Sequence, residues 1–173
     1  MSQCLSLKSD DILETGYLLE QEFKIPKEKM ILFFIMPVNE EGYDDTIAVL
    51  NKSFENGYHV IFVKENGEET DKIIDQESLK FSTKEGALLH FEQTRNYISL
   101  SLNYDVEPIK IDMGEDGFFI KAFTGKSRFV AIIFRRNNIV SMISLDMEGD
   151  IDEVMEETKK YAQILDKKII NCL

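Results

Sequence analysis

The side chains of this sequence that could perform acid–base chemistry begin with its two histidines. His59 stands at the start of an apolar strand, and His90 lies in a helix beside Leu89 and Phe91. Either imidazole could serve as a general base or a metal ligand, because its charge changes near neutral pH. Neither histidine has an Asp-His-Ser order or a His-x-x-x-His spacing around it. We therefore expect ordinary packed or surface histidines and assign no catalytic residue.

The acidic loop Asp146–Asp150, continued by Asp152, is a candidate calcium site. An EF-hand loop that started at Asp146 would place Glu157 at its twelfth position. Its sixth position, which requires glycine, would be Ile151. We expect these acids to favour a helix start instead, and we predict no metal site and no cofactor.

A second acidic group is formed by Glu40, Glu41, Asp44 and Asp45. A hydrolase with paired carboxylates holds its two acids about 5 to 9.5 Å apart across a cleft. Adjacent acids at the start of a helix are more simply partners of the helix dipole. The glycines offer no phosphate-binding loop either, because GxGxxG and GxxxxGK spacings are both absent.

One local basic cluster contrasts with the acidic composition. Its members are Lys121, Lys126, Arg128, Arg135 and Arg136, and the last four lie on neighbouring predicted hairpins, where they could gather near the strand ends. A small anion or an acidic peptide could bind there through bidentate arginine contacts. The alternative, which we favour, is that these cations pair with nearby acids.

The overall charge restricts the partners. Asp and Glu outnumber Lys and Arg by 32 to 20, which gives a net charge of −12. Because such a field repels phosphate backbones and anionic lipids, we expect no binding to nucleic acid or to membrane surfaces. Binding of a basic protein by an acidic face is an alternative, although solubility alone also favours an acidic composition.

Two cysteines, Cys4 and Cys172, lie at opposite ends of the chain. Chain ends often lie close together, so one disulfide between them is geometrically open. The amino terminus has neither a basic start nor a long apolar core, so it is not typical of a secretory signal. We therefore expect reduced thiols and a cytoplasmic location, or an envelope anchor at Cys4 if an upstream signal was removed.

The longest apolar run, Met30–Val38, is shorter than the roughly 20 residues that cross a bilayer. We therefore expect a soluble protein without a membrane span. With 43% hydrophobic and 30% charged residues in 173, the composition is typical of one globular domain, residues 1–173.

In the first half, a capping serine followed by two aspartates predicts a short helix at Ser9–Leu13, and hydrophobic periodicity predicts two longer helices. One begins at Asp44 and ends at Asn56–Gly57, and the other, with a Ser82/Glu85 capping box, covers 83–97. We predict strands at Tyr17–Ile25, Met30–Met36, Tyr58–Val63 and Ile73–Phe81, with a hairpin turn at Asn66-Gly67.

In the second half, turns separate four apolar segments and a helix follows them. The strands are predicted at Pro108–Met113, Phe118–Phe123, Arg128–Phe134 and Ile139–Leu145. The helix runs from Ile151 to Asp166 with Asp150 as its cap, and it must bury its apolar face on this sheet. The fold class is therefore α+β, a mainly antiparallel sheet flanked by helices and closed by an amphipathic C-terminal helix.

The segments Phe81–Ala87, Gly117–Phe119 and Phe134–Val140, followed by the closing helix, carry a family resemblance. Over Phe81–Ile170 the order of elements resembles the PsbP-like α/β/α sandwich group of small bacterial and archaeal proteins. In that group an Arg-x-Gly or Arg-Asn tip joins two apolar strands, and here Asn137-Asn138 takes its place. The resemblance implies a non-catalytic module that binds or assembles with a partner, and it transfers no site residues.

Three hypotheses follow for function. The favoured one is a non-catalytic binding or assembly module, with another protein as the expected type of partner and an undetermined oligomeric state. The second is a small enzyme with a carboxylate/His site between sheet and helices. The third is an acidic inhibitor or immunity-type protein that binds a basic partner. A histidine within hydrogen-bond reach of a carboxylate in a cleft would favour the enzyme.

Overall fold

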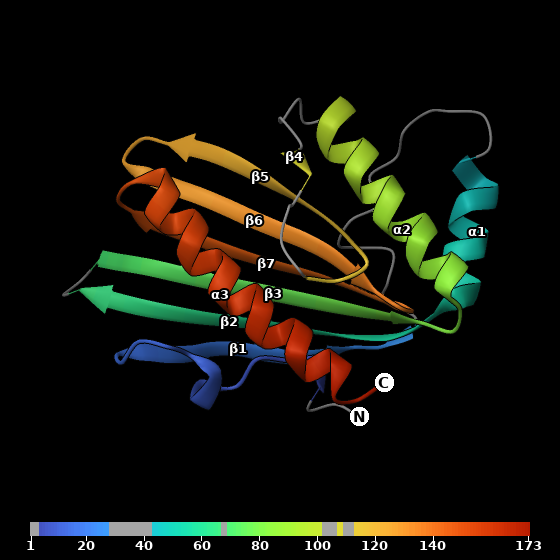
Figure 1. Ribbon diagram of the computed structural model, residues 1–173, viewed down its shortest axis with the longest axis horizontal. Coiled ribbons are helices and arrows are strands. Elements are labelled where there is room, and N and C mark those ends of the chain that lie inside the picture. The colour runs from blue at the N-terminus through green and yellow to red at the C-terminus, as the bar shows by residue number, and fades with distance from the viewer. Residues whose placement is uncertain (1–3, 28–42, 67–68, 102–106, 109–112) are drawn as a thin grey trace.

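The described part of the chain is organised around one antiparallel sheet (Figure 1). A computed structural model describes residues 4–27, 43–66, 69–101, 107–108 and 113–173. Within those residues the sheet has seven strands in the order β1-β2-β3-β7-β6-β5-β4. Every pair of neighbouring strands is antiparallel. The predicted fold class, an α+β protein with a mainly antiparallel sheet, is confirmed.

The element bounds are as follows. The strands are β1 (Tyr17–Ile25), β2 (Phe54–Asn66), β3 (Glu69–Phe81), β4 (Glu107–Pro108), β5 (Asp116–Thr124), β6 (Ser127–Arg136) and β7 (Ile139–Glu148). The α-helices are α1 (Tyr43–Ser53), α2 (Lys84–Asn96) and α3 (Ile151–Ile170). Two short helical turns cover Ser9–Asp11 and Tyr97–Ser101.

Helix α3 covers one face of the sheet (Figure 1). The apolar face that its periodicity predicts is buried, with Ile151 only partly so, and Tyr161 and Ile169 extend the buried stripe; the predicted members are Ile151, Val154, Met155, Thr158, Ala162 and Leu165. Asp150 caps the helix as predicted, because its carboxylate accepts a hydrogen bond from the Asp152 backbone N–H at 2.9 Å. The helix continues to Ile170, one turn beyond the predicted end, because Ile169 belongs to the same buried face.

Helices α1 and α2 lie over the opposite face of the sheet. Leu50 of α1 and Phe91 of α2 pack there in one cluster with Phe118 and Ile133 from the sheet. Two separate cores therefore sandwich the central strands, which explains why β6 is buried for six consecutive residues, Val130–Arg135.

The predicted C-terminus of α1 is wrong. The helix ends at Ser53, and Phe54 already belongs to β2. Asn56 and Gly57 do not form a left-handed helix end; they pair with Lys80 and Leu79 of β3. A Cβ on Gly57 would lie 2.7 Å from a Leu79 methyl carbon, so close cross-strand packing explains this glycine.

The cap of α2 also differs from the prediction. Thr83, rather than Ser82, is the N-cap residue, and its hydroxyl accepts a hydrogen bond from Gly86 N–H at 3.0 Å. Ser82 and Thr83 both carry a hydroxyl that can cap a helix. The backbone N–H of Ser82, which a capping box would pair with Glu85, instead donates to the Ser53 carbonyl at 2.6 Å.

The remaining strand predictions have mixed outcomes. Tyr17–Ile25 matches β1. Strand β3 begins four residues before its predicted start, and β7 ends three residues after its predicted end. Strands β5 and β6 are longer than predicted by one or two residues at both ends. The turn between β6 and β7 is Asn137-Asn138, and Asn137 adopts the left-handed conformation with φ 56°. Of the predicted strand Pro108–Met113, Pro108 belongs to β4, Met113 lies in no strand, and residues 109–112 lie outside the described residues. The predicted strand Met30–Met36 and the Gly67 half of the predicted turn lie outside the described residues.

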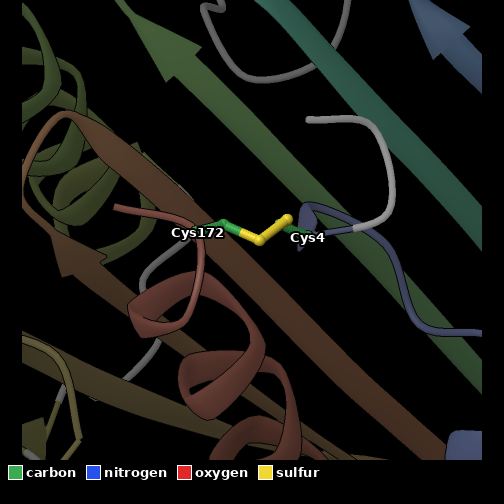
Figure 2. The surroundings of a disulfide bond; sticks show 2 residues. All are labelled: Cys4 and Cys172. Atoms are coloured by element: carbon green, nitrogen blue, oxygen red, sulfur yellow. A yellow bond between two sulfur atoms is a disulfide. The ribbon is translucent and has the colours of Figure 1, made fainter.

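The two ends of the chain are joined by a disulfide between Cys4 and Cys172 (Figure 2). The expectation of reduced thiols is wrong. The bond is feasible because the fold brings the two Cα atoms to 6.1 Å although 168 positions separate them in sequence.

The amino-terminal segment is also held by Gln76 of β3, which is fully buried. The Gln76 side chain accepts a hydrogen bond from Leu7 N–H at 3.0 Å and donates to the Leu5 carbonyl at 3.1 Å. It also donates to the Ser78 hydroxyl at 2.9 Å. One amide side chain thus replaces a strand partner for this segment, because it satisfies a backbone donor and a backbone acceptor together.

Among the described residues, no helix combines the length and the apolar character that a membrane crossing needs.

Gly86→Ala distinguishes helix propensity from packing. Propensity favours alanine by roughly 1 kcal/mol, but an added Cβ would lie 2.5 Å from the Ser53 hydroxyl oxygen and 2.7 Å from its Cβ. We expect the unfolding free energy to fall by about 1–3 kcal/mol, measured by urea denaturation. The double variant Ser53→Gly with Gly86→Ala should recover part of the loss. A more stable single variant would contradict this steric explanation.

The disulfide should contribute substantially to stability. Replacing both Cys4 and Cys172 by Ser should lower the unfolding free energy by about 2–5 kcal/mol, because the crosslink closes a loop of most of the chain. Urea denaturation of the oxidised protein, the reduced protein and the double variant measures this. The latter two should share one midpoint; a double variant as stable as the oxidised protein would refute the prediction.

Candidate functional site

A pocket of about 460 Å³ opens beside the disulfide, on the face of the sheet that α3 covers. We call it the terminal pocket, because both ends of the chain contribute to it. Its lining residues are Cys4, Leu5, Lys24, Asn56, Tyr58, Lys80, Asn137, Asn138, Ile139, Ile169, Cys172 and Leu173. The volume lies within the range of about 300–1,000 Å³ that is usual for small-molecule sites.

The floor of the terminal pocket is built by strand register. Lys24 of β1 is paired with Tyr58 of β2, and the next row on the same face pairs Asn56 with Lys80 and Lys80 with Ile139. Cross-strand neighbours on one face project side chains in the same direction. Three strands thus place two ammonium groups, an amide and a phenol together, and β7 adds an apolar side chain beside them.

The walls of the pocket come from the chain ends and from one hairpin tip. Cys4 and Leu5 are fixed by the disulfide and by Gln76, and Cys172 and Leu173 follow α3. The tip is anchored because Asn138 donates a side-chain hydrogen bond to the Phe81 carbonyl, and Phe81 N–H donates to the Asn138 carbonyl at 2.8 Å. Strand register, the disulfide and the anchored hairpin tip thus hold most of the described lining in place.

A second group of polar residues, which we call the sheet cluster, lies on the opposite face of the sheet. It consists of His59, Asp75, Glu77 and His90. His59 Nε2 lies 2.7 Å from Asp75 Oδ1, and Glu77 is directly across the β2–β3 ladder from His59. The hydrogen bond to Asp75 raises the pKa of His59. The structure thus joins His59 to a carboxylate, a contact that the sequence did not reveal.

Burial dominates the titration of the other two members. Loss of hydration raises the pKa of Glu77 to about 8 and lowers the pKa of His90 to about 4. A cavity of about 10 Å³ lies between them and is lined also by Thr94. It has room for about one water molecule, which is too little for a substrate. The terminal pocket is large enough for a substrate, but neither histidine is among its described lining residues.

The predicted basic cluster does not form one site. Lys126 lies in the β5–β6 turn and Arg128 at the start of β6, whereas Arg135 and Arg136 lie at its end. Arg135 pairs with Glu115 and Asp116, and Arg136 pairs with Asp166 of α3 at 2.6 Å. Lys121 lies 3.8 Å from Asp152. The favoured alternative, pairing with nearby acids, is therefore correct for these three residues.

The two predicted acidic groups lie at different places in the fold. Asp150 is the cap of α3, and Asp44 and Asp45 fall in the first turn of α1. Glu40 and Glu41 lie outside the described residues. Asp146 belongs to β7 rather than to a loop.

The residues of the terminal pocket carried no recognisable spacing. Lys24, Asn56, Lys80 and Asn138 come from distant segments and meet only through strand register. The available signals were weak: a cysteine near each end, and polar residues that interrupt the alternation of β3.

Comparison with known proteins gives a fold but no family. No family model and no curated protein matches the chain. A similar solved structure is the extracellular domain of PknH from Mycobacterium tuberculosis, with TM-score 0.60, 9% identity, and coverage of 96% of this chain and 94% of that one. The GTP binding regulator TM1622 from Thermotoga maritima matches at TM-score 0.41 and 12% identity, over 91% of this chain and 84% of that one. At such identities the first likeness concerns the fold alone.

The sheet cluster gives a pH prediction. Protonated Glu77 stabilises the fold below its ordinary pKa of 4.5, and this stabilisation is lost as the pH rises through about 8. Glu77→Gln removes the titration. We therefore expect its unfolding free energy, relative to wild type, to rise by about 1–3 kcal/mol between mildly acidic and mildly alkaline buffers.

Urea denaturation across that pH range measures the difference. Glu92→Gln, an exposed change in the middle of α2 and away from the helix start, is the matched control and should follow wild type throughout. If Glu77→Gln also follows wild type at every pH, Glu77 is not buried as an acid.

Proposed function

We propose that this protein is a non-catalytic binding module that holds a small ligand in the terminal pocket. The observation that carries the proposal is the pocket itself, about 460 Å³ in volume and lined by both polar and apolar side chains. A concave site with a few converging polar groups is the usual form of a small-molecule site. Its described lining residues include no nucleophile–base pair, so binding is a simpler role for it than chemistry.

We further propose that the module works outside the reducing cytoplasm. A disulfide that forms one wall of the pocket is stable only in an oxidising compartment. The similar structure of PknH is described as an extracellular domain, which supports the same setting. The PsbP-like resemblance of Phe81–Ile170 fits a binding role and stays part of this proposal.

The enzyme hypothesis has one observation in its favour, the 2.7 Å contact between His59 and Asp75. The cavity beside Glu77 and His90 is of water size, and a general base must reach a bound substrate. We therefore rank binding first. A protein partner, including a basic one that matches the net charge of −12, stays a prediction.

The proposal is tested by filling the pocket. Wild-type protein is screened by ligand-observed NMR against a library of small molecules with varied charge. Hits should be lost in Asn56→Trp, because an indole on the pocket floor occupies ligand volume. Asn96→Trp, the same change at an exposed position of α2, is the matched control and should keep every hit.

The introduced indoles also report on folding, because the chain contains no tryptophan. If hits persist in Asn56→Trp, or if the wild-type protein binds none of the library, the terminal pocket is not the binding site and the proposal fails.

A further inference from the structure

We propose that the terminal pocket selects small carboxylates that carry an apolar tail. This assignment rests on the proposed function, because it specifies the chemistry of the ligand for the same pocket. The carboxylate would meet Lys24 and Lys80, and the tail would lie toward the apolar wall.

The terminal pocket differs in charge from the chain as a whole. Its described lining contains two lysines and no aspartate or glutamate, whereas acids outnumber bases by 32 to 20 in the whole chain. The charged side chains of the described lining are thus all cationic, and the two ammonium groups outnumber the one anionic group of this lining, the α-carboxylate of Leu173. Such side chains favour an anion and disfavour a cation of equal shape. This small basic area is therefore opposite in sign to the rest of the molecule.

The two lysines of the pocket do not contribute equally to its charge. Lys80 forms an ion pair with Glu55 at 2.8 Å, so part of its charge is already balanced. Lys24 forms no ion pair with any described acid. Lys24 is therefore the cation of the described lining that is left to meet a ligand, and one ammonium group suits a monoanionic carboxylate better than a phosphate dianion.

Neutral hydrogen-bond donors lie beside these lysines. Asn56 and Asn137 line the pocket, and neither side chain forms a hydrogen bond with another described residue. Tyr58 adds a phenol. Amide and phenol N–H and O–H groups donate well to carboxylate oxygens. Asn138 is different, because its amide already donates to the Phe81 carbonyl.

One side of the pocket is apolar. Leu5, Ile139 and Ile169 are buried residues of the α3 core, and they line the pocket together with Leu173 and the disulfide. An aliphatic or aromatic tail placed there would remove apolar surface from water on both partners. A free inorganic anion would leave this wall unused.

The experiment compares three ligands of matched shape: octanoate, octanamide and octylammonium. Each is titrated into the full-length oxidised protein, and binding is followed by amide chemical shifts in two-dimensional NMR. We expect octanoate to bind tightest and octylammonium weakest. The shift changes should gather at Leu5, Lys24, Asn138 and Leu173.

Lys24→Gln is the decisive variant. It should weaken octanoate binding roughly 10- to 100-fold, the usual effect of losing a charged hydrogen bond, and change octanamide binding less than about twofold. Lys24→Arg keeps the charge and should restore octanoate binding. Lys126→Gln, an exposed change at the β5–β6 turn, is the control and should have no effect.

The outcomes separate this inference from the proposed function. Equal binding of octanamide and octanoate, or equal loss of both in Lys24→Gln, overturns the selection of carboxylates. That selection is also overturned if none of the three ligands binds although the library gives hits that are lost in Asn56→Trp. In that case the pocket binds a ligand of another chemical class. If those hits are also absent, both proposals fail.

Discussion

Burial of both faces of one sheet is the constraint on which the rest of this structure depends. Strands β3, β7 and β6 carry apolar side chains on both faces, so each face must be covered. Helix α3 covers one, and α1 with α2 the other. The helices of the first half and the closing helix therefore pack on opposite faces of the sheet, and each face has its own core.

The same constraint creates the terminal pocket. Helix α3 covers the middle of its face, and the amino-terminal segment must cover what remains. Gln76 and the Cys4–Cys172 disulfide fix that segment. Where the segment, the end of α3 and the β6–β7 tip meet, they enclose a space without filling it. The pocket is thus a consequence of how the two chain ends close one face of the sheet.

The polar residues of β3 explain why this strand was hard to recognise in detail. Its alternation is poor because Gln76 faces one core and Glu77 the other. Each is tolerated for a different reason. Gln76 completes the hydrogen bonds of a neighbouring segment, whereas Glu77 is held in its protonated form by burial, with its pKa raised to about 8. Buried polar groups of this kind obscure a pattern that depends on hydrophobic alternation.

The sequence by itself determined the fold class, most strands and the cap of α3, because these follow from local periodicity and capping over a few residues. It did not determine where α1 ends, since Phe54 and Gly57 suit a helix end as well as a strand, and only pairing with β3 selects the strand. Tertiary structure alone decided the disulfide, the contact of His59 with Asp75, and the assembly of the pocket floor. The physical reason is register: these residues are distant in sequence and become neighbours only when strands pair.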